Sequence, residues 1–299
     1  MRLATIRRSA SGDRYSGLSG SLALLATSLI WGVTFVILKV TVETIPPFSL
    51  AFGKFGIALA LLLVVSWNKL RHSWRACLPA SAFLGLLLAA AFILQLWGLQ
   101  RTSVSDAGFI TGLSVVLVAL LDLFVNKRWP SWYTLLGFMS ALVGLIILSL
   151  ERDFVVSIGN ILVLACAIPF GLHVFYTDRY SKLFETEVLT TEQMGVAALA
   201  TFCGLIFNQE THFEPSTYAI LGIIYVGIVA TALAFFLQTW GQKQMQATNS
   251  AVLLAAEPVF SAIFAVVILS EPVTSQLVVG GALVIVGMIV SSLHVKDRF

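Results

Sequence analysis

Two ionisable side chains, Lys54 and Glu257, stand inside long apolar stretches of the sequence. If these stretches cross a lipid bilayer, a charge near its centre costs about 2.5 to 3.5 kcal/mol and is kept where a partner or water meets it. Each residue lies about eight positions into its stretch, or about 12 Å deep at 1.5 Å per residue. We therefore expect both in one polar cavity. A static buried pair, or a Lys54 side chain that snorkels outward, is the alternative.

Glu257 directly precedes Pro258. Because the proline nitrogen carries no hydrogen, the carbonyl of Leu254 loses its helical donor. Irregular backbone at membrane depth is tolerated where protein or a water-filled cavity satisfies it. We interpret Glu257 as a cavity-lining carboxylate and as the candidate for gaining and losing a proton. A role in helix packing or in inter-helix hydrogen bonding is the alternative.

Aromatic residues extend this candidate site. Trp31 lies well inside an apolar stretch, although tryptophan usually marks the membrane interface. Phe170 stands 139 residues later in a similar setting. Further residues lie at spacings of three from these two, namely Ser28, Thr34, His173 and Tyr176. We expect all six to line the cavity, with ordinary helix packing of the tryptophan and a hydrogen-bonded packing histidine as the alternatives.

The chain contains an internal duplication. Residues 92–98 (FILQLWG) reappear as residues 235–241 (FFLQTWG), and the same offset of 143 pairs Gly137 with Gly280 and Gly144 with Gly287. The repeated amides, Gln95 and Gln238, either bind polar groups of a ligand or tie helices together. The small residues favour close helix packing.

Composition indicates what is repeated. Hydrophobic residues make up 58% of the chain and charged residues 11%, which is typical of an integral membrane protein. A membrane-spanning helix needs about 20 mostly apolar residues. The sequence predicts an all-α protein with ten such helices, at 19–38, 46–67, 77–98, 105–125, 132–150, 157–177, 190–207, 217–239, 249–269 and 273–293.

The distribution of Lys and Arg predicts the orientation, because cytoplasmic loops retain positive charge. With an inner N-terminus, 14 of the 18 Lys and Arg fall on the inner side and three on the outer side. Both termini, residues 1–17 and 295–299, are therefore predicted to be cytoplasmic tails. Each repeat, 18–150 and 157–294, holds an odd number of spans, so the two copies are inverted. Inverted repeats are characteristic of secondary transporters.

Other chemistry has no basis in the sequence. Phosphate-loop, dinucleotide, zinc-protease and serine-hydrolase motifs are absent, which argues against ATP drive and against an enzyme. The three cysteines lack the spacing of metal ligands. We interpret them as small apolar side chains that fill space between helices. We therefore predict no catalytic residue, no metal and no cofactor. The net charge of +3 reflects membrane topology and implies no nucleic-acid partner.

Several short motifs resemble one family. They are residues 31–35 (WGVTF), the Pro46-Pro47 pair with residues 52–55 (FGKF), residues 256–260 (AEPVF) and residues 270–272 (SEP). Together they resemble the EamA-type exporters of the drug/metabolite transporter superfamily over nearly the whole chain. The resemblance implies ten helices in two inverted five-helix repeats, and commonly export of amino acids or related metabolites across a bacterial inner membrane. Lys54 stands where the family usually has Arg, and Phe170-Gly171 where it usually has Trp-Ala.

We therefore expect a secondary transporter that exports small amphipathic metabolites, foremost amino acids, by alternating access. Its partners are a small-molecule substrate and the lipid bilayer. Phosphorylated or nucleotide-linked metabolites are the alternative substrates, and Lys54 with His173 keeps that alternative open. A membrane enzyme or a lipid scramblase is the alternative class, although the sequence contains neither a reactive cluster nor a lipid-facing polar stripe.

Overall fold

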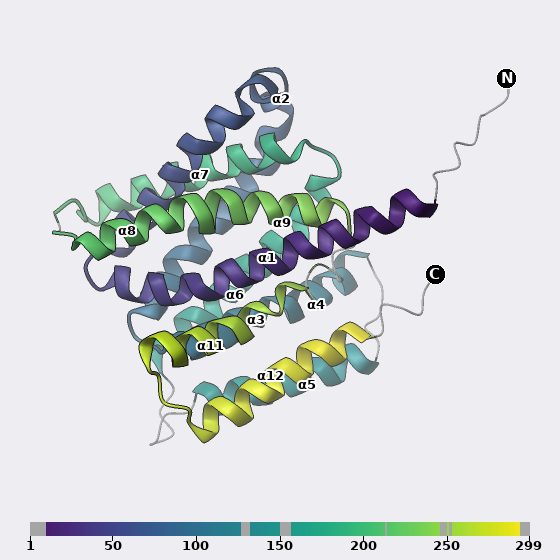
Figure 1. Cartoon of the computed structure of the whole chain (residues 1–299), viewed down its shortest axis with the longest axis vertical. Coiled ribbons are helices and arrows are strands. Elements are labelled where there is room, and N and C mark those ends of the chain that lie inside the picture. Colours follow the sequence, from purple (N-terminus) through teal and green to yellow (C-terminus); the bar gives the residue numbers. More distant parts are fainter. Residues whose placement is uncertain are drawn as a thin grey trace.

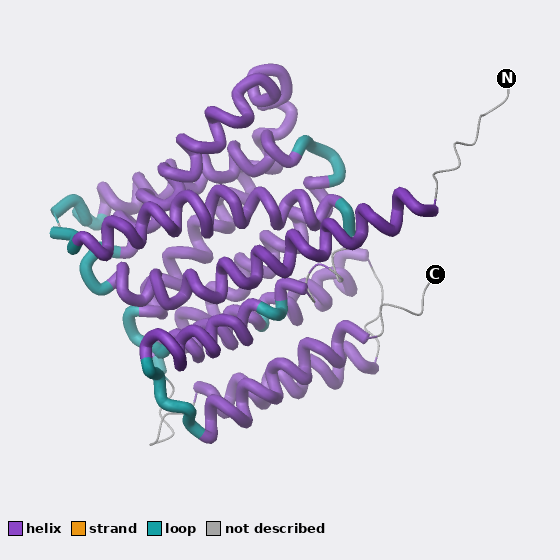
Figure 2. The backbone as a smooth tube through the Cα atoms, in the orientation of Figure 1, coloured by secondary structure: helices purple, strands orange, loops and turns teal. Residues whose placement is uncertain are grey.

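The computed structural model describes residues 10–126, 132–149, 157–212, 214–245, 250 and 253–293, and these residues form helices with short connections and no strand (Figures 1 and 2). The helices lie roughly alongside one another. Their bounds are α1 Ala10–Val42, α2 Pro47–Leu99, α3 Val104–Gly112, α4 Ser114–Asn126, α5 Trp132–Ser149, α6 Ile158–Ser181, α7 Thr186–Phe207, α8 Thr217–Tyr225, the π-helix η1 Val226–Leu233, α9 Ala234–Lys243, α11 Glu257–Leu269 and α12 Ser275–Leu293.

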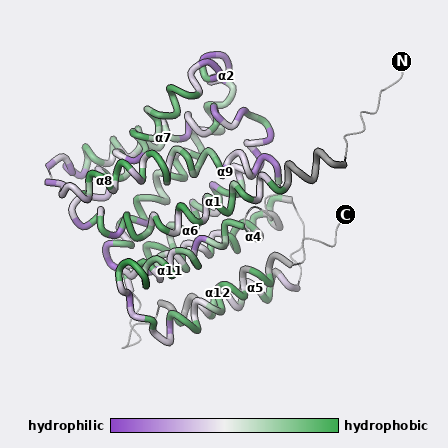
Figure 3. The backbone as a smooth tube through the Cα atoms, in the orientation of Figure 1, coloured by the Kyte–Doolittle hydropathy of each residue, from purple (hydrophilic) through white to green (hydrophobic). Residues whose placement is uncertain are grey.

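Much of the outer surface is apolar. Large side chains such as Val64, Phe207 and Tyr218 are 80% or more exposed, and hydrophobic residues run along the helices in Figure 3. Such a surface suits lipid better than water. Five described segments are long and apolar enough to cross a membrane: Leu18–Val42, Pro47–Leu99, Ile158–Ser181, Thr186–Phe207 and Thr217–Lys243. The prediction of an all-helical chain with several long apolar helices is confirmed, whereas the count of ten spans and the orientation of the termini stay predictions.

Helix α2 is 53 residues long but does not run straight. The rings of Phe55 and Phe92 lie 5.5 Å apart, whereas a straight helix would separate them by about 55 Å. The helix therefore folds back on itself near the top of Figure 1. Its first arm carries Phe55 and its second arm Phe92, and the two arms correspond to the predicted spans 46–67 and 77–98. The predicted connection between those spans is helical.

Two helices are interrupted at equivalent places. A turn at Leu113 separates α3 from α4, and a turn at Ala255 and Ala256 precedes α11. The offset of 143 residues relates Leu113 to Ala256, so the breaks are symmetry mates. Pro258 predicted the second break. The first was not predicted, because no proline lies near it.

The last helices of the two repeats pack together. Helix α5 lies against α12 (Figure 1), and the Ser140 hydroxyl donates to the Leu283 carbonyl at 2.9 Å. These two residues are themselves 143 positions apart. Gly137 and Gly280 are buried, in keeping with the close packing that small residues allow.

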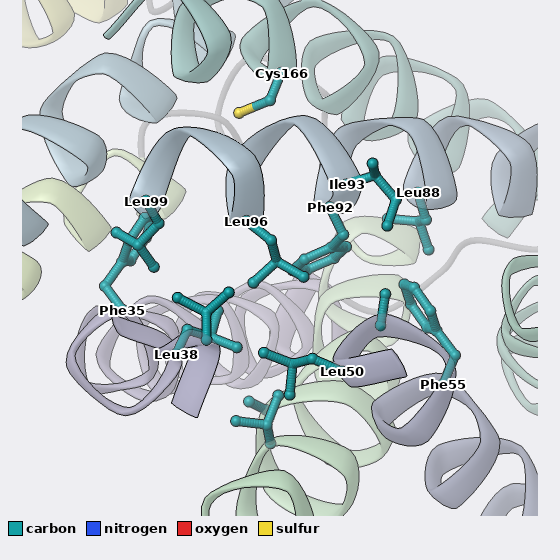
Figure 4. Packing of buried hydrophobic residues seen from close by; sticks show 14 of the residues in the cluster. Phe35, Leu38, Leu50, Phe55, Leu88, Phe92, Ile93, Leu96, Leu99 and Cys166 are labelled. Atoms are coloured by element: carbon teal, nitrogen blue, oxygen red, sulfur yellow. The ribbon is translucent and has the colours of Figure 1, made fainter. Parts of the chain in front are cut away.

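Between the helices lies an apolar core. In Figure 4, Phe35 and Leu38 of α1 approach Leu96 and Leu99 of the second α2 arm. Leu50 of the first arm joins the same cluster and is completely buried. These contacts fix α1 and both arms of α2 around the residues discussed below.

Glutamates join separate helices at one end of the bundle. The Glu271 carboxylate, just after α11, accepts from the backbone N–H groups of Val104 (2.7 Å) and Ser105 (3.1 Å) at the start of α3. Glu210, after α7, accepts from the N–H of Phe48 (2.7 Å) at the start of α2. The first N–H groups of a helix have no partner within it, and the helix dipole favours an anion there. Each glutamate therefore satisfies the beginning of a helix from the other repeat.

A lysine makes the corresponding contact at the opposite kind of helix end, where a positive charge meets free carbonyl groups. Lys39, near the end of α1, donates to the carbonyls of Leu99 (2.7 Å) and Thr102 (3.0 Å) at the end of α2. A cation at a helix C-terminus is the favourable arrangement. We call the part of the bundle that holds Lys39, Glu210 and Glu271 the clamped end. It lies at the side of Figure 2 where several connecting loops gather.

Candidate functional site

A cavity lies among α1, both arms of α2, and the two interrupted helices. Its empty space, counted out to its mouth, is about 740 Å³, of which the centres of water molecules can occupy about 60 Å³. Eight of the ten residues that the sequence predicted line it: Trp31, Thr34, Lys54, Gln95, Phe170, His173, Gln238 and Glu257.

The other two predicted residues, Ser28 and Tyr176, are not part of the wall. The Ser28 hydroxyl is completely buried and donates to the Leu253 carbonyl at 3.0 Å, so it ties α1 to the segment before α11. The Tyr176 ring packs edge-on against Phe83 at 5.1 Å and stacks on Tyr180 at 5.9 Å. These two side chains hold helices together and lie outside the wall of this cavity.

Lys54 is 1% exposed and points at aromatic rings. Its ammonium nitrogen lies 2.9 Å from the centroid of the Phe92 ring and 5.0 Å from that of Phe55. A cation over an aromatic face is stabilised by about 2 kcal/mol when water is excluded. Among the described residues, no carboxylate lies within 4.0 Å of this nitrogen. Neither the static pair with Glu257 nor a snorkelling lysine is observed.

Glu257 is the first residue of α11 and lines the cavity. Its symmetry mate, Ser114, is the first residue of α4 and lines it too. Both interrupted helices therefore resume at the cavity wall. Helices that break at corresponding places in two repeats are the usual pointer to a transporter's substrate site.

Aromatic rings form a continuous face between these polar groups. The Phe92 ring lies edge-on to Phe170 at 5.1 Å and to Phe235 at 6.2 Å, and Phe235 is 5.0 Å from Trp31. The Trp31 indole N–H donates to the Ala230 carbonyl at 2.9 Å. Ala230 belongs to η1, and π-helical turns occur frequently at functional sites. An apolar portion of a ligand would rest on this face.

His173 and Gln238 differ in how their polar atoms are satisfied. The His173 ring shares a 2.9 Å hydrogen bond through Nε2 with the Gln193 side-chain oxygen, so the histidine both lines the cavity and anchors α6 to α7. The Gln238 amide is completely buried, and neither its oxygen nor its nitrogen has a partner. A helix-tying role requires a partner, so Gln238 fits the alternative of a ligand-binding amide.

Sequence reasoning missed the polar stretch 190–193 (TTEQ) of α7, which includes the partner of His173. All four residues are buried. The signal was available, since four consecutive polar residues are unusual in an apolar helix. The predicted span begins at residue 190, which places these four residues at its first turn.

The described residues contain no group of three or more His, Cys, Asp and Glu that could hold a metal ion. The cavity instead offers one ammonium, one carboxylate, one imidazole and two amides around an aromatic face. This set suits hydrogen bonding and ion pairing with a small amphipathic ligand.

The sequence and the fold were compared with those of known proteins. A model of the EamA-like transporter family matches the chain twice, over residues 18–150 and 157–293. The chain belongs to this family. An uncharacterized transporter of Archaeoglobus fulgidus is 29% identical over 99% of this chain and 92% of its own length. The uncharacterized transporter YetK of Bacillus subtilis is 25% identical over 95% of this chain and 88% of its own length.

A solved structure described as "Crystal structure of protein" shares the fold of this EamA-like chain. Its TM-score is 0.69 at 22% identity, covering 91% of this chain and 96% of that one. The family resemblance predicted from short motifs is thus confirmed, and the chain is a membrane transporter rather than an enzyme by family and by its relatives' names.

Proposed function

We propose that this EamA-like protein is a secondary transporter that exports small amphipathic metabolites, with amino acids as the principal substrates. The observation that carries the proposal is the presence of Lys54 and Glu257 in one cavity without a salt bridge between them. Because opposite charges that are kept apart remain available, each can pair with a ligand charge.

A zwitterion matches this arrangement. Its carboxylate would meet Lys54 and its ammonium would meet Glu257, while its side chain rests on the aromatic face formed by Trp31, Phe92 and Phe235. Phosphorylated metabolites would need more than the single lysine that the cavity supplies. This charge balance favours amino acids over the phosphorylated alternative.

The transport cycle we propose is alternating access. Ten spans in two inverted repeats would rock against one another around the cavity. In the predicted orientation the clamped end faces outward and both termini face the cytoplasm of a bacterial cell, across its inner membrane. Glu257 would titrate during the cycle, because its negative charge has to be balanced by a proton once the substrate leaves.

Uptake of a labelled amino-acid panel into proteoliposomes, with and without a pH gradient, tests the proposal. We expect saturable flux in the wild-type protein. Glu257→Gln should weaken apparent affinity by about 10- to 100-fold, since a hydrogen bond to a charged group contributes about 1.5 to 3 kcal/mol. Glu43→Gln at an exposed residue changes net charge equally and should leave the flux unchanged.

The outcome distinguishes the substrate classes. Flux of sugar phosphates or nucleotide-linked compounds without flux of amino acids would replace the substrate assignment by the phosphorylated alternative. Unchanged transport and unchanged pH dependence in Glu257→Gln would refute the role of this carboxylate.

A further inference from the structure

One turn of α7 is polar on every side and buried among other helices. Residues 190–193 (TTEQ) are 0%, 1%, 9% and 0% exposed. Four consecutive residues cover the whole circumference of a helix with 3.6 residues per turn. Buried polar groups are nearly always hydrogen-bonded, so each of these side chains needs a partner.

Two of the four have one, and both partners lie on other helices. The Thr191 hydroxyl shares a 2.7 Å hydrogen bond with that of Ser66 on the first arm of α2. The Gln193 oxygen bonds the His173 ring of α6, which lines the cavity. The polar turn therefore connects the cavity wall to the packing of α7 on α2.

Glu192 has only neutral partners. Its carboxylate meets the side chains of Cys77 and Ser81 on the second arm of α2, which bond each other at 3.2 Å and are completely buried. Neither contact has the geometry of a well-formed hydrogen bond to the carboxylate, and the Thr190 hydroxyl is likewise without a partner. Within the described part of the chain, no cation lies within 4.0 Å of Glu192.

The other titratable groups around this position are already engaged or are weak acids. Tyr176 and Tyr180 of α6 pack against the apolar cluster that includes Cys77. Glu187, on the preceding turns of α7, is paired with Lys69 at 2.9 Å. The Glu192 carboxylate therefore faces a thiol and a serine hydroxyl, neither of which can neutralise its charge.

We propose that Glu192 is a proton-binding site of this transporter, separate from the substrate cavity. An ionised carboxylate buried without a positively charged partner is so costly that it takes up a proton instead. Hard metal cations need about six oxygen ligands, and this position supplies one carboxylate with the hydroxyls of Ser81 and Thr190. A proton is the ligand that the surroundings can accept.

Proton release requires water to reach the carboxylate, and so requires α7 to separate from the second arm of α2. Because Gln193 links the same turn to His173, that separation also shifts the cavity wall. The proton then passes from the carboxyl oxygen to water on the Lys69 side of the bundle, the cytoplasmic side in the predicted orientation. The proton is taken up from water on the outer side in the outward-open state of the proposed alternating access, and its release on the inner side then couples the pH gradient to the proposed transport.

Two transport measurements in proteoliposomes test this coupling, which rests on the proposed function. Counterflow exchange needs no net proton movement, whereas accumulation under a gradient of one pH unit does and can reach about tenfold for one-for-one exchange. We expect Glu192→Gln to retain counterflow within twofold and to lose the gradient-driven accumulation. Glu187→Gln, five residues away at a half-buried carboxylate already paired with Lys69, should match the wild type in both. Gradient-driven accumulation that survives Glu192→Gln would overturn the proposal.

A third measurement does not depend on transport. If Glu192 holds a proton in the folded protein, ionising it at higher pH opposes folding, so the melting temperature of the purified protein falls as pH rises from 5 to 9. Glu192→Gln should flatten that fall, and Glu192→Asp should keep it while shifting its midpoint. Absence of flux with a flattened profile would refute the transport proposal alone. An unchanged pH profile in both variants would refute the proton site. If Glu192→Gln does not fold, the midpoint in Glu192→Asp decides between the same two outcomes.

Discussion

Replacing Gln238 by leucine should make the protein more stable and a worse transporter. The Gln238 amide is completely buried, and both its oxygen and its nitrogen lack a partner. Each unsatisfied buried polar group costs about 1 to 3 kcal/mol, and an apolar residue of similar shape removes that cost. We therefore expect Gln238→Leu to raise the free energy of unfolding by about 1 to 3 kcal/mol.

The same helix provides a matched control in Gln242. This residue is also completely buried and its side-chain oxygen has no partner, but its side-chain nitrogen donates to the Val174 carbonyl of α6 at 3.0 Å. Gln242→Leu removes that bond together with one unsatisfied oxygen, whereas Gln238→Leu removes two unsatisfied atoms and no bond. The identical substitution, one turn apart on α9, should therefore raise stability less at Gln242 than at Gln238.

Thermal unfolding in detergent and counterflow in proteoliposomes measure the two effects. Gln238→Leu should melt several degrees above the wild type, and its apparent substrate affinity should fall about 2- to 10-fold for the loss of one hydrogen bond. If Gln238→Leu melts below the wild type, then Gln238 ties helices together and the argument from its unsatisfied amide is wrong.

Three further predictions concern other parts of the molecule. Lys54→Met should weaken transport of an amino acid by about 10- to 100-fold, while leaving an amine that lacks the carboxylate within twofold, measured by competition in counterflow. Glu271→Gln should cost about 1 kcal/mol of stability and speed hydrogen exchange at the first amides of α3, which it satisfies; unchanged exchange there would contradict the clamp. Gly32→Ala should destabilise by about 1 to 3 kcal/mol in thermal melts, because a Cβ there would lie 2.4 Å from that of Phe260. Gly56→Ala meets nothing within 4 Å and should be neutral or stabilising.

The sequence predicted the cavity residues best where a polar group stands alone in apolar surroundings. Lys54, Glu257 and Gln238 all line it, because burying such groups is costly enough to reveal them. Predictions of cavity residues from their spacing of three along a helix were less accurate. Residues three apart on a helix are rotated by about 60° from each other, so a series of two such steps, from Phe170 to Tyr176, leaves the cavity face.

The interruption at Leu113 shows a different limit. Nothing in its immediate sequence lacks a hydrogen-bond donor, so local reasoning gave no sign of it. Its symmetry mate next to Pro258 did carry the signal, and the duplication could have transferred that prediction to the first repeat. The partner of His173 was missed for a similar reason, since the polar stretch of α7 is buried by helices distant in sequence.

The three contacts of the clamped end share a property with consequences for motion and for sequence change. In each, a charged side chain meets main-chain atoms at the tip of a helix. Water can replace a side chain at such a tip, because the amides and carbonyls there are orphaned in any helix. Separation at this end would thus exchange one hydrogen-bonding partner for another, with little net change in free energy. Since a main-chain partner exists whatever residue stands there, we expect substitutions at the positions facing Lys39 and Glu210 to be better tolerated than loss of the charges, whereas Ser105 also donates its hydroxyl to Glu271 at 2.6 Å.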